Sequence, residues 1–279
     1  MLVFTKIKSA QEHLRSLKKG TTIGFVPTMG ALHNGHLSLV EQAKKKNDIV
    51  VVSIFVNPTQ FDKKEDLINY PKTIDQDLSL LKSVYCDIVF TPTAQEIYAN
   101  NIQSQTFSFE GLEYQMEGKY REGHFDGVGT IVKRLFEIVS PEKAYFGEKD
   151  FQQLQIIKKM VKLHQLPVKI VGCEIYRESD GLAMSSRNVR LTKNHREAAP
   201  FIYKTLKKAK IEFGTKSVQE ILEWVKNEFD EHPLLKLEYF EIADEKTLQP
   251  IKNKSIKQKI RAFIAVFAGK IRLIDNIRL

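Results

Sequence analysis

The stretch TTIGFVPTMGALHNGHLSLV, Thr21 to Val40, predicts a strand, a turn and the start of a helix in direct succession. TTIGFV is rich in β-branched and apolar residues, and a helical pattern begins near Gly35. Between them, Gly30 and Gly35 allow the backbone to turn tightly or to approach a phosphate closely. A strand, a turn and a helix in this order form the repeating unit of α/β folds.

The same alternation of strand and helix continues outward from this stretch. The chain opens with a short strand and an amphipathic helix before residue 21. Further strands are expected at 49–56, 86–92, 143–147 and 167–175, and further helices at 74–84, 128–139 and 151–164. Near-continuous apolar strands separated by helices predict a parallel sheet that is covered on both faces.

The pattern changes after about Glu174. Two long amphipathic helices are expected at 195–213 and 217–231, followed by strands at 236–244, 261–269 and 270–275. Helices followed by consecutive strands predict a smaller α+β domain with an antiparallel sheet. We therefore expect an α/β fold with two domains and a boundary near Glu174 to Ser179.

The composition is typical of a globular protein, with 42% hydrophobic and 28% charged residues among 279. No apolar segment approaches the roughly 18 residues of a membrane span, and the N-terminus does not resemble a secretion signal. We therefore expect a cytoplasmic protein without a membrane partner. Cys86 and Cys173 fit neither a disulfide framework nor a metal site, and we expect both to fill apolar space.

The net charge of +9 is compatible with nucleic acid, acidic lipid or small anionic substrates as partners. The densest basic stretch, residues 252–261, contains no aromatic side chains for base stacking. We interpret it as a solvated loop and expect no nucleic-acid partner.

His33 and His36 lie three residues apart at the expected start of a helix, which leaves three interpretations. They line a turn, bind a metal or contact a phosphate. Zinc is disfavoured because the metalloprotease pattern places its histidines four apart with a glutamate between them, and no third ligand is near. The pattern HxGH between a strand and a helix is similar to the signature of nucleotidyltransferases and class I aminoacyl-tRNA synthetases.

Polar side chains also follow the second predicted strand. Asn57 and Gln60 lie in SIFVNPTQF, which on its own indicates a turn. YPKTIDQD adds Tyr70 and Asp77, and a capped helix start is the simpler interpretation of this segment. A tentative contact of Asp77 with Mg²⁺ is the alternative.

Three later segments face the same expected edge of the sheet or could close on it. GKYREGHFDGVGT offers Arg121 and His124 in a glycine-rich segment before a helix. FGEKDFQQLQ offers Lys149 for a phosphate and Asp150 as either a helix cap or a carboxylate facing Mg²⁺. DGLAMSSRN offers two serine hydroxyls and Arg187, which suit a polyphosphate.

Taken together, these motifs resemble the pantothenate synthetase (pantoate-beta-alanine ligase) family. PTMGALHxGH, NPTQF, YPKT, REGHF, AYFGEKDFQQL, DGLAMSSRN and RLIDNI occur in the family's order from about Ile23 to Asn276. The resemblance implies ATP-dependent adenylation of pantoate, release of pyrophosphate, and attack by β-alanine to give pantothenate and AMP. It also implies Mg²⁺, a cytoplasmic homodimer, a Rossmann-like domain over residues 1–175 and a C-terminal α+β lid over 176–279.

The resemblance further implies the residues of the site. His36, His33, Lys149 and Arg187 are expected to act in catalysis. Contacts with ATP are expected from Met29, Gly30, Ala31, Leu32, His33, Asn34, Gly35, His36, Gly147, Glu148, Lys149, Asp150, Tyr176, Met184, Ser185, Ser186 and Arg187. Pantoate and β-alanine are expected at Gln60 and Gln153, with Asn57, Tyr70, Arg121 and His124 as further candidates.

The chain departs from the family pattern at a few positions. Asn34 and Lys72 replace residues that are commonly Glu and Arg, and neither position carries an expected chemical role. Gln76 stands where some relatives have an acid, which removes one expected acidic contact with Mg²⁺.

Two other functions are compatible with parts of the sequence. A plain nucleotidyltransferase would stop at an adenylyl product, but a phosphorylated acceptor calls for more cations than two glutamines supply. A nucleic-acid-binding protein with an inactive nucleotide fold would show salt-sensitive binding without ATP turnover.

Overall fold

The computed structural model describes residues 1–62, 64–99, 101–255 and 258–279. These residues divide into two compact units. The first comprises Met1–Glu113, Glu117–Glu148 and Gln153–Glu174, and the second Tyr114–Met116, Lys149–Gln152 and Ile175–Leu279. Two short segments therefore belong to the second unit although the first unit surrounds them in sequence. The predicted boundary after residue 175 stays a prediction.

The first unit contains a parallel sheet, as predicted. Its strands are β1 (Leu2–Phe4), β2 (Ile23–Thr28), β3 (Ile49–Ile54), β4 (Ile88–Phe90), β5 (Lys143–Gly147) and β6 (Lys169–Cys173). They lie in the order β1-β4-β3-β2-β5-β6, and every neighbouring pair is parallel. The expected α/β fold class is confirmed.

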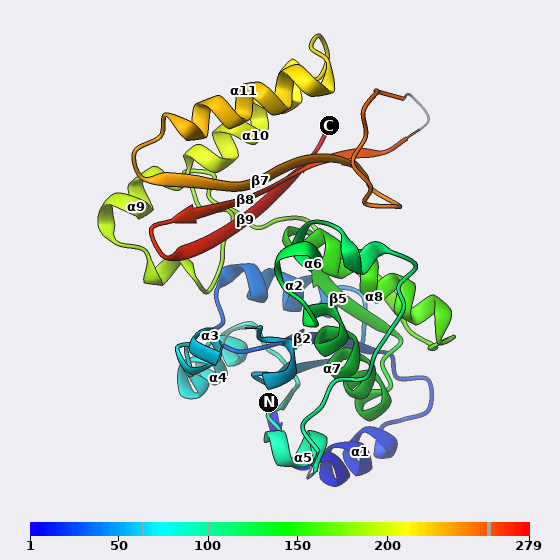
Figure 1. Ribbon diagram of the computed structural model, residues 1–279. Coiled ribbons are helices and arrows are strands. Elements are labelled where there is room, and N and C mark those ends of the chain that lie inside the picture. The colour runs from blue at the N-terminus through cyan, green and yellow to red at the C-terminus, as the bar shows by residue number, and fades with distance from the viewer. Residues whose placement is uncertain (63, 100, 256–257) are drawn as a thin grey trace. The chain divides into compact units, whose positions relative to one another are not determined.

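Helices connect these strands (Figure 1). They are α1 (Ile7–Ser16), α2 (Asn34–Lys44), α3 (Lys64–Ile68), α4 (Ile74–Ser83), α5 (Ala94–Tyr98), α6 (Met116–Tyr120), α7 (His124–Val139) and α8 (Phe151–Leu163). Short 3-10 turns are η1 (Pro58–Gln60), η2 (Leu112–Tyr114) and η3 (Glu148–Asp150). None of the helices in the described part of the chain is long and apolar enough to cross a membrane.

The strands bury side chains on both faces of the sheet. On one face, Val26 packs in a cluster with Val40 of α2 and Leu81 of α4. On the other face, the ring of Phe25 lies 6.2 Å from that of Phe136 in α7, centroid to centroid. Because both faces are covered, the strands are apolar almost throughout, which is why the sequence shows apolar runs rather than strict alternation.

The strand order places a switch point beside β2. From β2 the chain adds β3 and β4 on one side and β5 and β6 on the other. In open parallel sheets, ligands bind beyond the carboxyl ends of the strands at such a point. The residues that follow β2 and β5 are therefore favourably located for binding.

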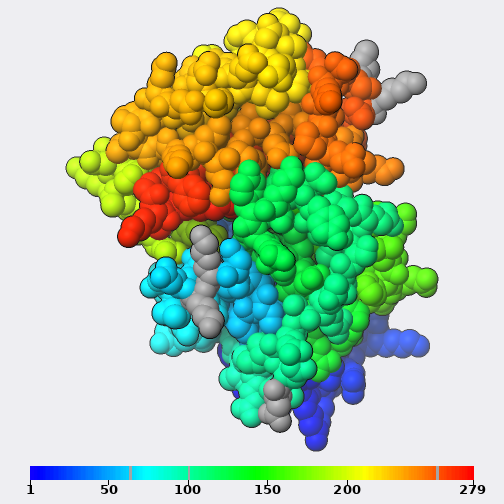
Figure 2. Space-filling view, viewed as in Figure 1, coloured from blue at the N-terminus to red at the C-terminus, as the bar shows by residue number. Residues whose placement is uncertain are grey.

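The second unit is an antiparallel sheet covered by helices, also as predicted. Its elements are η4 (Asn188–Arg190), α9 (Lys193–Ala198), α10 (Phe201–Glu212), α11 (Val218–Asp230), β7 (Leu235–Asp244), β8 (Ile260–Ala268) and β9 (Ile271–Arg278). Apolar residues such as Leu206 of α10, Val225 of α11 and Ile264 of β8 form its core. Helix α11 contacts β7, and the yellow to orange atoms of this part of the chain lie next to one another in the space-filling view (Figure 2).

Several element boundaries differ from the predictions, and the larger differences concern α9, α10, α7 and β9. The single helix expected over 195–213 is divided into α9 and α10 at Pro200, which has no backbone N–H to continue the helical ladder. Helix α7 begins at His124 rather than at 128, and β9 extends to Arg278. Residues 252–255 of the basic stretch are exposed, while residues 256 and 257 lie outside the described residues.

Candidate active site

His33 and His36 cap the N-terminus of α2. Nδ1 of His33 accepts a hydrogen bond from the backbone N–H of Gly35 at 3.1 Å. Nδ1 of His36 accepts one from the backbone N–H of His33 at 3.3 Å, which completes a reciprocal capping box. The predicted helix start is confirmed, and the two imidazoles satisfy backbone donors that a helix otherwise leaves without partners.

This capping also fixes the tautomer of both rings. A ring nitrogen that accepts an N–H cannot carry a proton itself, so each neutral ring carries its proton on Nε2. The ring centroids lie 4.0 Å apart. Two Nε2–H donors are therefore held side by side at a helix N-terminus, where the helix dipole favours an anion.

The turn before α2 is held by a carboxylate. Asp77, at 1% exposure, accepts the backbone N–H of Ala31 through Oδ2 at 3.0 Å and that of Leu32 through Oδ1 at 2.8 Å. Thr73 donates to Oδ1 as well. Gly30 has a φ of +82°, and a Cβ there would lie 3.0 Å from Oδ2 of Asp77, so the close approach of α4 requires glycine.

These contacts show what the side chain of Asp77 does in the structure. Both of its oxygens accept hydrogen bonds from the protein and the side chain is buried, which favours a structural role, and the expected contact of Asp77 with Mg²⁺ stays a prediction. The described residues also contain no group of three or more His, Cys, Asp or Glu side chains that could hold a metal ion.

Gln60 is oriented by a chain of hydrogen bonds behind it. The hydroxyl of Tyr98 donates to Oδ1 of Asn57 at 2.5 Å, and Nδ2 of Asn57 donates to Oε1 of Gln60 at 3.1 Å. Because Oε1 is thus identified as the acceptor, Nε2 faces the other way and lies 2.9 Å from Sδ of Met29. The arrangement presents an N–H₂ donor at the carboxyl end of β2.

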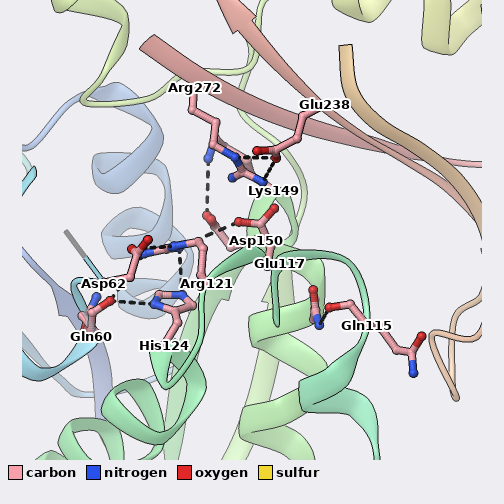
Figure 3. A network of polar contacts seen from close by, with 11 residues as sticks. Gln60, Asp62, Gln115, Glu117, Arg121, His124, Lys149, Asp150, Glu238 and Arg272 are labelled. Carbon is pink, nitrogen blue, oxygen red and sulfur yellow. Dashed lines mark hydrogen bonds and ion pairs between the residues drawn. The ribbon is translucent and has the colours of Figure 1, made fainter. Parts of the chain in front are cut away.

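His124 and Arg121 hold the backbone of Gln60. Nδ1 of His124 lies 2.8 Å from the carbonyl oxygen of Gln60, and Nε2 lies 3.0 Å from Nη1 of Arg121 (Figure 3). Arginine can only donate, so Nε2 accepts and Nδ1 carries the proton. Arg121 also pairs with Asp62 at 3.4 Å. The expected contact of these two residues with substrate stays a prediction.

The pKa of His124 is lowered to about 4. Burial is the main cause, the positive charge of Arg121 adds to it, and the hydrogen bond to the Gln60 carbonyl opposes it. His124 is therefore neutral at pH 7, which agrees with its place as acceptor from Arg121 and donor to Gln60.

The other candidates in the first unit have varied surroundings. Tyr70 is buried and packs edge-on against Phe61, with 5.7 Å between ring centroids. Gln153 is half-buried in α8, Gly147 is the last residue of β5, and Glu148 is the first residue of η3. The two cysteines are buried free thiols, and burial raises the pKa of Cys86 to about 12 and that of Cys173 to about 11.

In the second unit, Lys149 and Asp150 lie at the junction of η3 and α8. Their side chains form an ion pair at 3.6 Å, with exposed fractions of 18% for Lys149 and 47% for Asp150. This exposed carboxylate contrasts with the buried Asp77.

The segment that contains Ser185, Ser186 and Arg187 follows a small hairpin. Its strands are joined by a bridge between Arg177 and Ala183, and the N–H of Met184 donates to the carbonyl of Tyr176 at 3.0 Å. Ser185 accepts the backbone N–H of Arg187 through Oγ at 3.2 Å. The hairpin thus brings Tyr176 beside Met184, two positions that are 8 residues apart in the chain.

Several supporting residues were not predicted. Tyr98 orients Asn57, and Arg177 holds the hairpin by donating to the carbonyl of Gly181 at 3.1 Å. Asp275 and Asn276 were part of the recognised RLIDNI motif, but no role was predicted for them. Their contacts join residues far apart in sequence, so no local pattern indicates them.

Comparison with known proteins gives a consistent result. The family model of pantoate-beta-alanine ligase matches residues 2–278. A pantothenate synthetase from Flavobacterium psychrophilum is 54% identical over 281 residues, and the alignment covers all of both chains. Another from Christiangramia forsetii is 55% identical over 281 residues and covers 100% of this chain and 99% of the relative.

Solved structures are similar over the whole chain as well. The crystal structure of pantothenate synthetase from Thermus thermophilus superposes with a TM-score of 0.92 at 38% identity and covers 99% of each chain. The pantoate-beta-alanine ligase of Francisella tularensis, solved with β-γ ATP and β-alanine, has a TM-score of 0.83 at 38% identity. That comparison covers 100% of this chain and 97% of the other.

Proposed function

Because this chain belongs to the pantoate-beta-alanine ligase family, we propose that it joins pantoate to β-alanine with ATP and releases AMP and pyrophosphate. In the first step a carboxylate oxygen of pantoate attacks the α-phosphorus of ATP, and the bond to pyrophosphate breaks. In the second step the amine of β-alanine attacks the acyl carbon of pantoyl adenylate, and AMP leaves. The product is pantothenate.

The main structural support for this function is the pair of Nε2–H donors of His33 and His36 at the start of α2. The carboxylate of pantoate is ionised at pH 7 and needs no base. The difficulty is the approach of an anion to a polyanion, which positioned donors and cations relieve. A protonated Nδ1 would face a backbone N–H, so the geometry favours hydrogen-bond donation by His36 to the departing pyrophosphate over proton transfer.

ATP binding is assigned to three segments of the chain. They are Met29 to His36 after β2, Gly147 to Asp150 after β5, and the segment that contains Tyr176 and Met184 to Arg187. The backbone N–H groups of Ala31 and Leu32 already donate to Asp77, so these two residues would contribute through shape rather than through their amides. Lys149 and Arg187 are the cations that would meet the phosphates.

Pantoate and β-alanine binding is assigned to Gln60 and Gln153. The orientation of Gln60 supports this, because its N–H₂ group suits a carboxylate and adds no charge that Mg²⁺ and the cations would have to balance.

Mg²⁺ would accompany ATP as a counter-ion to its phosphates. In nucleotide enzymes this ion is normally bound through one or two carboxylates together with the phosphates. Asp150 fits this requirement, since its carboxylate is 47% exposed. The ion would neutralise charge on the β- and γ-phosphates, and the chain's own residues would position the α-phosphate.

We infer from the family that the protein is a cytoplasmic homodimer. Light scattering on the purified protein would give its mass in solution, and a mass of one chain would contradict the dimer.

Pyrophosphate exchange into ATP tests the proposed reaction. The full-length protein is incubated with ATP, Mg²⁺ and labelled pyrophosphate, with pantoate or β-alanine added separately. Label should enter ATP with pantoate alone. Without β-alanine only the first step takes place, and its reversal incorporates labelled pyrophosphate into ATP. Exchange that requires β-alanine, or none with pantoate, would contradict the adenylate route. ATP-independent binding of RNA or DNA would instead favour the nucleic-acid alternative.

A further inference from the structure

Strand β9 carries two adjacent buried polar residues that the proposed reaction does not use. Asp275 is 4% exposed and Asn276 is 2% exposed. Burying polar groups is costly unless hydrogen bonds replace their lost contacts with water. The partners of these side chains therefore indicate what they hold in place.

Asn276 connects β9 to the segment that carries Lys149. Its Nδ2 donates to the backbone carbonyl of Lys149 at 2.9 Å, and its Oδ1 accepts from Nη1 of Arg261 at 2.5 Å. Because a guanidinium has only donors, Arg261 determines which end of the amide is the oxygen. The N–H₂ group is thereby directed to Lys149.

The residues after Lys149 are held by the same sheet. The guanidinium of Arg261 lies over the ring of Phe151, 3.9 Å from its centroid, and this ring lies 5.9 Å from that of Phe263. All of these residues belong to the second unit. The segment Lys149–Gln152 is therefore attached to the antiparallel sheet, although it directly follows β5 of the parallel sheet.

Asp275 fixes the strand beside Asn276. Its two oxygens accept from the guanidinium of Arg177 at 2.7 and 2.9 Å, and Oδ1 also accepts the backbone N–H of Asn276 at 2.7 Å. Removal of either partner would leave a buried charge without compensation. Asp275 is consequently a poor position for a functional test, whereas neutral Asn276 is a good one.

We propose that Asn276 is a positioning residue for Lys149. By holding the Lys149 carbonyl it fixes the start of a long and flexible side chain, so that the ammonium reaches the ATP phosphates in the reactive geometry. The inference rests on the proposed function, which assigns Lys149 to ATP. It also gives a role to the RLIDNI motif.

Two substitutions in the full-length protein test the contact. Asn276→Ala removes both hydrogen bonds. Asn276→Asp keeps an acceptor for Arg261 and loses the donor to Lys149. In pyrophosphate exchange, both should lower kcat/KM for ATP by about 10- to 100-fold and change the KM for pantoate by less than about twofold. Lys236→Ala is the control, because Lys236 is exposed on β7 of the same sheet; it should behave as wild type.

A double-mutant cycle separates positioning from a general structural effect. In a Lys149→Ala background, Asn276→Ala should lower kcat/KM for ATP by less than about twofold, since the side chain to be positioned is gone. An equal loss in both backgrounds would overturn the inference. Wild-type kinetics of Asn276→Ala would also overturn the inference. The proposed function would still stand in that case if Lys149→Ala were impaired. Unchanged ATP dependence of Lys149→Ala would overturn both. Circular dichroism confirms that each variant is folded.

Discussion

At position 36 the two nitrogens of one imidazole serve different purposes. Nδ1 accepts the backbone N–H of His33 and stabilises the start of α2, while Nε2 carries the proton that the proposed reaction uses. Replacing His36 with alanine would remove both contributions together. Amide side chains can separate them, because asparagine places its amide near the position of Nδ1 and glutamine places it near that of Nε2.

We predict different effects on adenylation for these two substitutions at His36. His36→Asn should keep the cap and remove the donor, so unfolding free energy stays near wild type while adenylation falls by about 100-fold or more. His36→Gln should also keep the cap, because glutamine at the third helical position accepts the N-cap N–H in a capping box, and its longer amide should retain more adenylation. Urea denaturation and single-turnover AMP formation measure the two quantities. Equal adenylation rates in both variants would contradict donation from Nε2.

His124 should make the stability of the protein depend on pH. Its pKa is about 4 in the folded protein, against 6.5 for an ordinary histidine, so between these two pH values the unfolded chain binds more protons. The contribution of neutral His124 to the free energy of unfolding should therefore be complete above pH 6.5. It should be lost as the pH falls toward 4, by about 1.4 kcal/mol for each pH unit.

The variant His124→Asn should remove this pH dependence. Asparagine can still donate to the Gln60 carbonyl but does not titrate. Urea denaturation gives the change in unfolding free energy between pH 7 and pH 5. This change should be about 2 kcal/mol smaller in the variant than in the wild type, because all other titrating groups are the same in both proteins. The same pH dependence in both proteins would mean that His124 is not held neutral by its surroundings.

Among the elements, α4 determines the shape of the turn between β2 and α2 through Asp77. Its carboxylate accepts two backbone N–H groups of that turn. An asparagine at position 77 has one oxygen and would direct an N–H₂ group toward a donor. A buried donor left without a partner costs about 1–3 kcal/mol.

Asp77→Asn should accordingly destabilise the protein by about 1–3 kcal/mol without changing the Mg²⁺ concentration needed for half-maximal activity. Asp75→Asn, in the same first turn of α4 but exposed, is the control and should be neutral. Thermal unfolding and a Mg²⁺ titration of pyrophosphate exchange measure the two effects. A raised Mg²⁺ requirement at normal stability would restore the predicted metal contact.

The elements themselves were largely predictable, because their patterns are local. Apolar runs identified the strands, and the glycine-rich turn before Asn34 identified the start of α2. The division of the helix at Pro200 could also have been predicted from the missing N–H. The contacts that orient the site were not predictable: Asp77 lies 46 residues from Ala31, and Asn276 lies 127 from Lys149. No periodicity connects residues at such distances.

For the whole molecule, the sequence predicted two units and a basic net charge but not how the chain distributes between the units. Lys149–Gln152 interrupts the first unit and belongs to the second. This assignment arises from contacts with β8 and β9, such as that of Arg261 with Phe151. Motif order alone groups Lys149 with the parallel sheet, since β5 immediately precedes it.

The net charge of +9 should affect the two kinds of substrate differently. ATP is a polyanion and is attracted by the field of the molecule, whereas β-alanine is a zwitterion without net charge. Raising NaCl from about 0.1 M to about 1 M shortens the screening length from about 10 Å to about 3 Å. We expect kcat/KM for ATP to fall by about tenfold and that for β-alanine, measured at saturating ATP and pantoate, by less than about twofold. Equal losses for both substrates would indicate a general effect of salt on the protein instead of electrostatic attraction of ATP.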